Sequence, residues 1–200
     1  MITDTDILKM EPSLFSDACF ESQKLSSGLN GIVAGTQFTS SGVDFTSAGI
    51  GAGHVIKLVS ADGAIDGVFE IVSVIDSTHL TVSVLRSDPA GSPVPVGSAS
   101  GLNWEIKTYA PQIYDIEQEL SFRLRCTPGY PASGIALDEI DNPAAVKRAW
   151  LYLLLAMLYG TLYASYPPSP DGSSPEVWGD FQTKSTRYRR CAERMIVWLG

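Results

Sequence analysis

The chain has 200 residues, of which 44% are hydrophobic and 18% are charged, and its formal net charge at pH 7 is −8. That length suits one domain, or one domain with a smaller insert, and the hydrophobic content excludes a wholly disordered chain. The charge is uneven, since residues 1–142 hold 7 basic and 18 acidic side chains, whereas residues 143–200 hold 7 basic and 4 acidic. An acidic body argues against adhesion to nucleic acid over the whole surface.

The cysteines and histidines predict neither a disulfide framework nor a metal site. The three cysteines lie far apart without a C-x-x-C motif, at Cys19, Cys126 and Cys191, which suits a reducing compartment. His54 and His79 each lack a second ligand at a suitable spacing, so we expect no metal and no cofactor. The opening "MITDTDILKM" has acidic residues where a signal peptide would be basic, which predicts translation in a cytoplasm without export.

The first 30 residues are predicted to be helical. Thr3–Asp6 offers N-cap residues for a short helix, and Pro12 fits the first turn of a second helix that runs to about Leu25. The glycines of "SSGLNG" are expected to end that helix.

From about Gly31 the pattern changes to short β-type runs separated by Gly, Asp and Ser turns. Both faces of the run 67–75 are largely apolar, which predicts packing on both sides, as in a small closed barrel. The stretch Asp88–Gly101 is interpreted as a loop because its prolines and glycines do not suit a central strand. We therefore expect a β-barrel-like module at 31–109.

The glycine-rich stretch "SAGIGAGHVIKLV" raises the possibility of a phosphate-binding loop at Gly49, Gly51 and Gly53. Such a loop must lead into a helix, but the residues His54–Val59 that follow are typical of a strand. No Lys-Ser or Lys-Thr pair follows the glycines either. We interpret them as turn residues that lead into a strand.

Helical periodicity returns at Ala110, with an apolar stripe at Ile113, Ile116, Leu120 and Leu124. Asp141 or Asn142 then caps a helix with Pro143 at its first position, ending near Ser165, and a last helix runs from about Glu176 to Leu199. The predicted fold class is α+β, a helical bundle formed by residues 1–30 and 110–200 with the barrel-like module 31–109 inserted between them.

The stretch Ala149–Tyr166 carries no charge, and its length makes it a transmembrane candidate. It also contains a glycine, a threonine, a serine and four tyrosines. A helix that is apolar all round is otherwise buried in a core, or shared between a core and a neighbouring subunit. We favour the buried or interface helix, with Trp150 and Leu154 at a subunit interface, and keep an inner-membrane protein as an alternative.

The last helix has the clearest pattern, with apolar or small residues at alternating spacings of three and four from Trp178 to Leu199. Four basic residues line up beside that stripe, at Lys184, Arg187, Arg190 and Arg194. A charge row of this kind is either a solvated face or a docking face for an acidic partner or a phosphate backbone.

No catalytic constellation is recognisable, since the chain has no G-x-S-x-G and no cysteine with a histidine close to it in sequence. The carboxylates Asp138, Glu139 and Asp141 are interpreted as capping groups at a helix start rather than an acid–base pair. We therefore expect no catalytic residues and a protein that is not an enzyme.

Three stretches together resemble parts of bacteriophage neck proteins. "TDTDILKMEPSLF" is similar to the opening of head-to-tail adaptor (connector) proteins, and "TYAPQI" resembles a segment that follows the β-module in some neck proteins. The region "FTSAGIGAGHVIKLVSADGAIDGVFEIVSVIDSTHLTVSV" resembles small β-barrel modules of phage neck and tail proteins. The last two helices suit the adaptor helical bundle. Compact adaptors are mainly helical, so the inserted barrel is a departure from the family pattern.

The resemblance implies a structural virion protein that forms a homo-oligomeric ring, usually a dodecamer, below the portal. Such a ring continues the DNA channel, lets genomic DNA pass without sequence specificity, and offers a surface to the tail or to a second neck protein. The implied location is the virion neck, after assembly in the cytoplasm of the host bacterium, with no membrane contact. Another phage neck or tail-completion protein is the alternative within this class.

Overall fold

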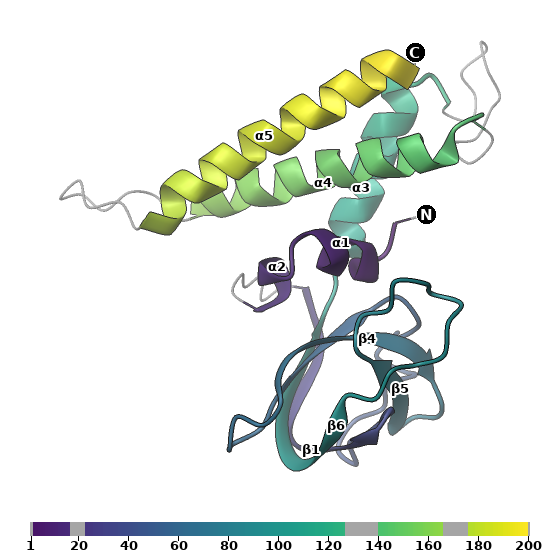
Figure 1. Ribbon diagram of the computed structural model, residues 1–200, viewed down its shortest axis with the longest axis vertical. Coiled ribbons are helices and arrows are strands. Elements are labelled where there is room, and N and C mark those ends of the chain that lie inside the picture. The colour runs from purple at the N-terminus through teal and green to yellow at the C-terminus, as the bar shows by residue number, and fades with distance from the viewer. Residues whose placement is uncertain (1, 17–22, 127–139, 166–175, 200) are drawn as a thin grey trace. The chain divides into compact units, whose positions relative to one another are not determined.

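The computed structural model describes residues 2–16, 23–126, 140–165 and 176–199 (Figure 1). Among these residues the fold is mixed α and β, with five helices and a closed barrel of six strands. Contacts between Cα atoms divide the chain into two compact units. One unit runs from Thr3 to Tyr109, and the other from Ala110 to Gly200 together with the first two residues.

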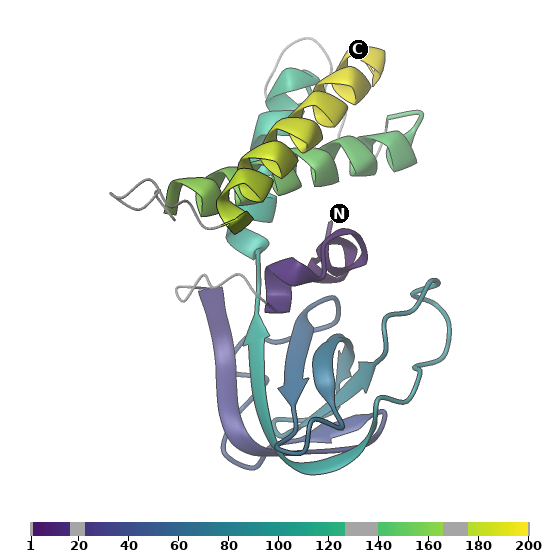
Figure 2. The ribbon, with the colours of Figure 1, turned by 60° about the vertical axis from the view of Figure 1, so that its left-hand side comes forward.

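The barrel is antiparallel throughout and has the strand order β1-β2-β5-β4-β3-β6 (Figure 2). This confirms the α+β class and the barrel-like module expected from the two apolar faces of the run 67–75. The strands are β1 (Lys24–Gly35), β2 (Gln37–Thr39), β3 (Val55–Val59), β4 (Asp66–Val74), β5 (His79–Ser83) and β6 (Gly97–Lys107).

The barrel begins earlier than the sequence predicts, because β1 starts at Lys24 rather than near Gly31. The helix expected to reach Leu25 ends at Ser16, and residues 17–22 lie outside the described part of the chain. The glycines of "SSGLNG" lie inside β1 and do not stop a helix. A Cβ at Gly28 would come within 2.9 Å of the Trp104 ring, and one at Gly31 within 2.7 Å of the Phe38 ring. These two glycines are therefore explained by the large side chains of the neighbouring strands β6 and β2.

The barrel core is centred on three buried aromatic rings. Phe38 and Trp104 meet edge to face with ring centroids 5.6 Å apart, and Phe45 lies 5.7 Å from Trp104. Aliphatic side chains from all the long strands complete this core, including Ile56, Leu58, Ile71, Leu80, Val82, Leu102 and Ile106. Edge-to-face aromatic packing adds to the stabilisation from apolar burial, so the interior is filled rather than hollow.

The helices α1 (Asp4–Met10) and α2 (Ser13–Ser16) belong to the barrel unit. The sequence analysis grouped residues 1–30 with the C-terminal helices, whereas Thr3–Tyr109 forms one unit here. Long-range contacts explain this. The buried Asp4 carboxylate accepts a hydrogen bond from the backbone N–H of Tyr109 at 2.8 Å, and the Tyr109 hydroxyl donates to the carbonyl of Leu14 at 2.6 Å. The N-cap Thr3 is as predicted, and its N–H donates to Asp6.

The glycine-rich stretch forms turns, as predicted, and leads directly into β3. Gly49 and Gly53 have φ values of 69° and 91°, a region that favours glycine. His54 accepts a hydrogen bond from the N–H of Gly51 at 3.0 Å, which closes the turn. The stretch therefore serves the geometry of the barrel.

The segment Asp88–Gly101 is only partly a loop, since its last five residues already belong to β6. The loop is held at its base, where the largely buried Arg86 side chain pairs with the buried Glu70 carboxylate of β4. Arg86 also donates to the carbonyl of Gly91, and the N–H of Val94 donates to the Ser83 hydroxyl at 2.8 Å. These bonds fasten the loop to the barrel wall.

The second unit contains α3 (Ala110–Arg123), α4 (Pro143–Ser165) and α5 (Glu176–Leu199). The bounds of α4 and α5 agree with the prediction, and Asn142 caps α4 by accepting a hydrogen bond from the N–H of Ala145 at 3.1 Å. In α3 the predicted stripe is buried at Ile113, Ile116 and Leu120, whereas Leu124 follows the helix. Both α3 and α5 pack against α4.

Candidate interaction surface

The inner side of α5 packs along α4 through aromatic rings and a close helix approach. Tyr188 stacks on Tyr152 and Tyr159, with ring centroids 5.9 and 6.1 Å apart, and Phe181 lies 5.9 Å from Tyr159. The Ser185 hydroxyl donates to the carbonyl of Ala156 at 2.8 Å. Contacts between 152 and 188 and between 159 and 181 show that the two helices run antiparallel. The part of the predicted stripe from Phe181 to Ala192 thus belongs to the packing face of α5.

Lys184 is separated from the other three basic residues of the predicted row. Its ammonium lies 4.8 Å from the centroid of the Tyr159 ring and donates to the Tyr159 hydroxyl at 3.1 Å. The lysine therefore turns toward α4, where it makes a cation–π contact and half buries its stem. The sequence could not show this, because Tyr159 comes from another helix.

Arg187, Arg190 and Arg194 are exposed on the outer side of α5. Their spacing of three and four residues places them in one row, opposite the side that packs on α4. No hydrogen bond or ion pair of these three guanidinium groups is seen within the described chain. Residues 187–194 hold four arginines and one glutamate, so this side of α5 is basic.

Trp150 and Leu154 lie in the core of the helical unit rather than on its surface. Leu154 is 0% exposed and Trp150 is 4% exposed, and the Trp150 indole donates to the carbonyl of Ile113 in α3 at 3.3 Å. The sequence analysis placed both residues at a subunit interface. The apolar character of α4 is explained by its burial within the chain, because α3 and α5 pack against it.

The basic row ends next to two exposed apolar residues that the sequence analysis did not single out. Val197 is 82% exposed and Trp198 is 68% exposed. Trp198 follows Arg194 by four residues, so the row Arg187, Arg190, Arg194 and Trp198 continues along one side of the helix. Their position away from the packing side of α5 could have been inferred from the sequence, because neither Val197 nor Trp198 lies on the 3-4 stripe of apolar residues in α5. We call Arg187, Arg190, Arg194, Val197 and Trp198 the α5 outer face.

A second exposed face with aromatic residues lies on α3. Tyr114 is 61% exposed and Phe122 is 64% exposed, and with Gln118 they follow at intervals of four residues. Asp115 and Glu119 are exposed beside them, and Glu119 pairs with Arg123 one turn further along. We call Tyr114, Asp115, Gln118, Glu119 and Phe122 the α3 outer face. It lies opposite the buried stripe of α3.

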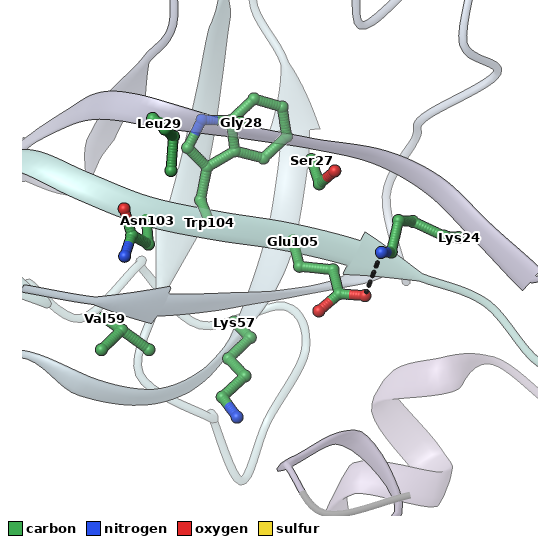
Figure 3. A pocket seen from close by; sticks show the side chains of 9 residues that line it. All are labelled: Lys24, Ser27, Gly28, Leu29, Lys57, Val59, Asn103, Trp104 and Glu105. Carbon is green, nitrogen blue, oxygen red and sulfur yellow. Dashed lines mark ion pairs between the residues drawn. The ribbon is translucent and has the colours of Figure 1, made fainter. Parts of the chain in front are cut away.

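A groove of about 470 Å³ crosses the barrel wall over β1, β6 and β3 (Figure 3). Its charged groups are already paired within the barrel unit. Glu105 lies 3.5 Å from Lys24 and 3.0 Å from Lys107, and the Lys57 ammonium donates to the carbonyl of Ser16 at 3.0 Å. The buried indole nitrogen of Trp104 has no hydrogen-bond partner among the described residues. Because its charges are satisfied internally, this groove is a weaker docking candidate than the α5 outer face.

The two histidines fix turns. Burial lowers the pKa of His54, whose ring accepts the Gly51 N–H. The His79 ring lies 2.8 Å from Asp76, whose pKa of about 2 is held down first by the backbone N–H of Thr78 and then by His79. Within the described chain no group of three or more His, Cys, Asp or Glu side chains is arranged to hold a metal ion. Asp138 and Glu139 lie outside the described residues, and Asp141 is exposed.

The membrane alternative rests on the stretch 149–166, most of which lies in α4. None of the helices that the structure describes combines the length and the apolar character that a bilayer crossing requires.

Comparison with models of protein families, with curated proteins and with solved structures gave no match.

Proposed function

We propose that this protein is a structural virion subunit, a head-to-tail adaptor that forms a ring below the portal of a bacteriophage. The ring continues the DNA channel toward the tail, and the protein resides in the virion neck after assembly in the host cytoplasm. The proposal is supported by the order of helices, barrel and helices along the chain. It is also supported by the resemblance of Thr3–Phe15, residues 45–84 and Thr108–Ile113 to neck and tail proteins.

The single observation that carries the proposal is the α5 outer face. Three exposed arginines continue into an exposed valine and tryptophan on one side of a helix. Arginine and tryptophan are the residue types most enriched at the energetic centres of protein interfaces. A convex helical surface of this composition is suited to association with another macromolecule, which is what a ring subunit requires.

In this proposal α3, α4 and α5 form the helical bundle of the adaptor, and the barrel unit is an added module. The acidic body allows DNA to pass without adhesion, because like charges repel the phosphate backbone. The α5 outer face is the docking surface for a portal subunit, a neighbouring adaptor or a tail protein.

Negative-stain imaging of the purified protein, alone and mixed with portal, tests the proposal. We expect rings stacked on the portal, with the twelve subunits that the resemblance implies. In an infection, removal of the protein should leave filled heads and separate tails. The proposal would be wrong if the protein did not associate with portal and if heads still joined to tails normally when the protein is removed.

The second candidate is another neck or tail-completion protein. It is favoured by the barrel, which resembles modules of both neck and tail proteins. Co-purification distinguishes the two candidates, because an adaptor is retained by tailless heads, whereas a tail-completion protein is retained by headless tails.

A further inference from the structure

The structure leaves two exposed faces of opposite character on one unit, the α5 outer face and the α3 outer face. We propose that the α5 outer face of one copy docks on the α3 outer face of a second copy of this chain. This inference rests on the ring of the proposed function and names the surfaces that would build it.

Charge complementarity is the first argument for a second copy as the occupant. The α5 outer face presents Arg187, Arg190 and Arg194, whereas the α3 outer face carries the exposed carboxylates Asp115 and Glu119, of which Glu119 also pairs with Arg123. The guanidinium of an arginine forms paired hydrogen bonds with a carboxylate, and opposite charges across an interface fix its register.

Exposed aromatic rings are the second argument. The exposed large aromatic residues of the described chain are Tyr114, Phe122 and Trp198, and all three lie on α3 or α5. Each is more than 60% exposed, which is costly for a large ring in water. Interfaces are rich in aromatic residues and arginine, so these two faces have the composition of a protein interface.

The geometry of the two helices is the third argument. Tyr114 and Phe122 are eight residues apart, or about 12 Å along a helix, and Arg187 and Trp198 are eleven apart, or about 17 Å. The two faces therefore match in length to within one helical turn. Each lies on a helix that packs on α4 through its other side.

The pairing predicts the symmetry of the assembly. A contact between two different faces is heterologous, so it repeats from copy to copy and gives a closed ring or an open filament instead of a two-fold dimer. A ring needs this type of contact. A phosphate backbone is the competing occupant of the arginines, but it gives no role to the acidic and aromatic face of α3.

Two charge-reversed variants test the pairing. The first carries Arg187→Glu, Arg190→Glu and Arg194→Glu, and the second carries Asp115→Arg and Glu119→Arg. Sedimentation velocity over a range of concentrations measures assembly of the full-length chain, and circular dichroism confirms that each variant is folded. In each variant alone, the α5 and α3 outer faces carry charge of the same sign and repel each other. The association constant of each variant should therefore fall at least about a hundredfold.

An equal mixture of the two variants should restore assembly. The glutamates on α5 of the first variant meet the new arginines on α3 of the second, and the remaining faces are the native pair. Subunits then alternate, and a ring with an even number of copies closes. Because a merely damaged surface cannot be repaired by mixing, restored assembly supports the pairing, and failure to restore it overturns the pairing.

A matched pair of substitutions separates the aromatic contribution from general surface effects. Phe122→Ser and Leu29→Ser both remove an exposed apolar side chain, with exposures of 64% and 71%, but Leu29 lies on β1 of the barrel. Only Phe122→Ser should weaken assembly, by about tenfold or more. Equal effects of the two substitutions would contradict the pairing.

The remaining outcomes distinguish the inference from the proposed function. Rings that persist in both charge-reversed variants would reject this pairing while leaving the adaptor ring intact. A wild-type chain that stays monomeric at every concentration would also reject it, and portal binding would then decide the proposed function separately. If the first variant alone loses salt-dependent binding to DNA while still assembling, the arginines serve nucleic acid and the pairing is wrong.

Discussion

The two units use their apolar side chains in different ways. The barrel unit closes upon itself, since every strand has two neighbours and the aromatic rings of Phe38, Phe45 and Trp104 are buried inside. The helical unit buries α4 but leaves Tyr114, Phe122 and Trp198 exposed. The barrel also exposes large apolar residues, such as Leu29 and Ile32, but among its described residues these are aliphatic or methionine.

This difference indicates that the two units have different roles. A closed barrel has no free strand edge, so it is protected against association through β-pairing. A helix packed on one side only keeps its other side available, and its charges set what binds there. The helical unit is therefore where we expect assembly contacts, and the following substitutions test how separate the two units are.

The largest effect is expected from Leu154→Asp in α4. Leu154 is 0% exposed, so the new carboxylate would be buried without a partner and should lower stability by about 3–5 kcal/mol. Hydrogen exchange measured by mass spectrometry should show loss of protection in α3, α4 and α5, with protection retained in the barrel strands. Thr161→Asp, at an exposed position of the same helix, is the control and should change little. Loss of protection in both units alike would show that they fold as one.

The next effect concerns Asp4, which joins α1 to Tyr109 inside the barrel unit. Burial is the main cause that raises its pKa from 3.8 to about 6, against hydrogen bonds from Tyr109 and Thr108 that lower it. The folded state then binds the proton more tightly than the unfolded state. The stability contributed by protonated Asp4 is fully present below pH 3.8, and it is lost as the pH rises through about 6.

Asp4→Asn tests this link because the amide keeps an acceptor oxygen for the Tyr109 N–H but cannot ionise. The variant should be more stable than the wild type at neutral pH, by at most about 3 kcal/mol, and the difference should disappear in acid. Urea unfolding at a series of pH values measures it. If the free energy of unfolding depended on pH in the same way in both proteins, Asp4 would not be the cause of that dependence.

A smaller effect is expected from Gly31→Ala in β1. The new Cβ would lie 2.7 Å from the Phe38 ring and 2.8 Å from the Trp104 ring, closer than Cβ atoms normally approach, so the rings or the backbone must shift. Overpacking should cost about 1–3 kcal/mol. Gly42→Ala is the control, because a Cβ there meets nothing within 4 Å. Urea midpoints measure both, and a neutral Gly31→Ala would mean that the core is loosely filled.

The smallest effect is expected from the single substitution Arg187→Gln. An exposed arginine contributes under about 1 kcal/mol to folding, so the thermal unfolding temperature should stay nearly unchanged. Unfolding followed by circular dichroism measures this. A large destabilisation would show that the α5 outer face contributes to the fold of the chain itself rather than being a free surface.

Predictions from the sequence succeed where the pattern is local and strong. The bounds of α4 and α5 follow from proline, capping residues and periodicity, and the strands β3, β4 and β5 follow from apolar runs between turns. The first part of β1, before Gly31, is missed because its serines and glycines are poor strand formers. It is a strand because β6 and Trp104 lie across from it, and Trp104 is 76 residues from Gly28 in the chain.

The candidate surface was also predicted only in part. The spacing in the sequence placed Arg187, Arg190 and Arg194 on one side of a helix, and all three are exposed there. Lys184 was assigned to the same row, but its ammonium contacts Tyr159 of α4 and so does not point outward with the three arginines. The exposure of Tyr114, Phe122 and Trp198 could not be read from the pattern, since exposure depends on which neighbours cover a helix.

The sequence by itself determined the α+β class, the position of the two long helices, the turn before β3 and the basic row of α5. Each of these features depends on residues close together in the chain, whose periodicity directly indicates a helix, a strand or a turn. Only the tertiary structure decided that the N-terminal helices join the barrel, through contacts between residues as far apart as Asp4 and Tyr109. It alone decided that Trp150 and Leu154 are core residues and that aromatic rings remain exposed on α3 and α5. Burial is a property of all the neighbours of a residue, and most of those neighbours are distant in sequence.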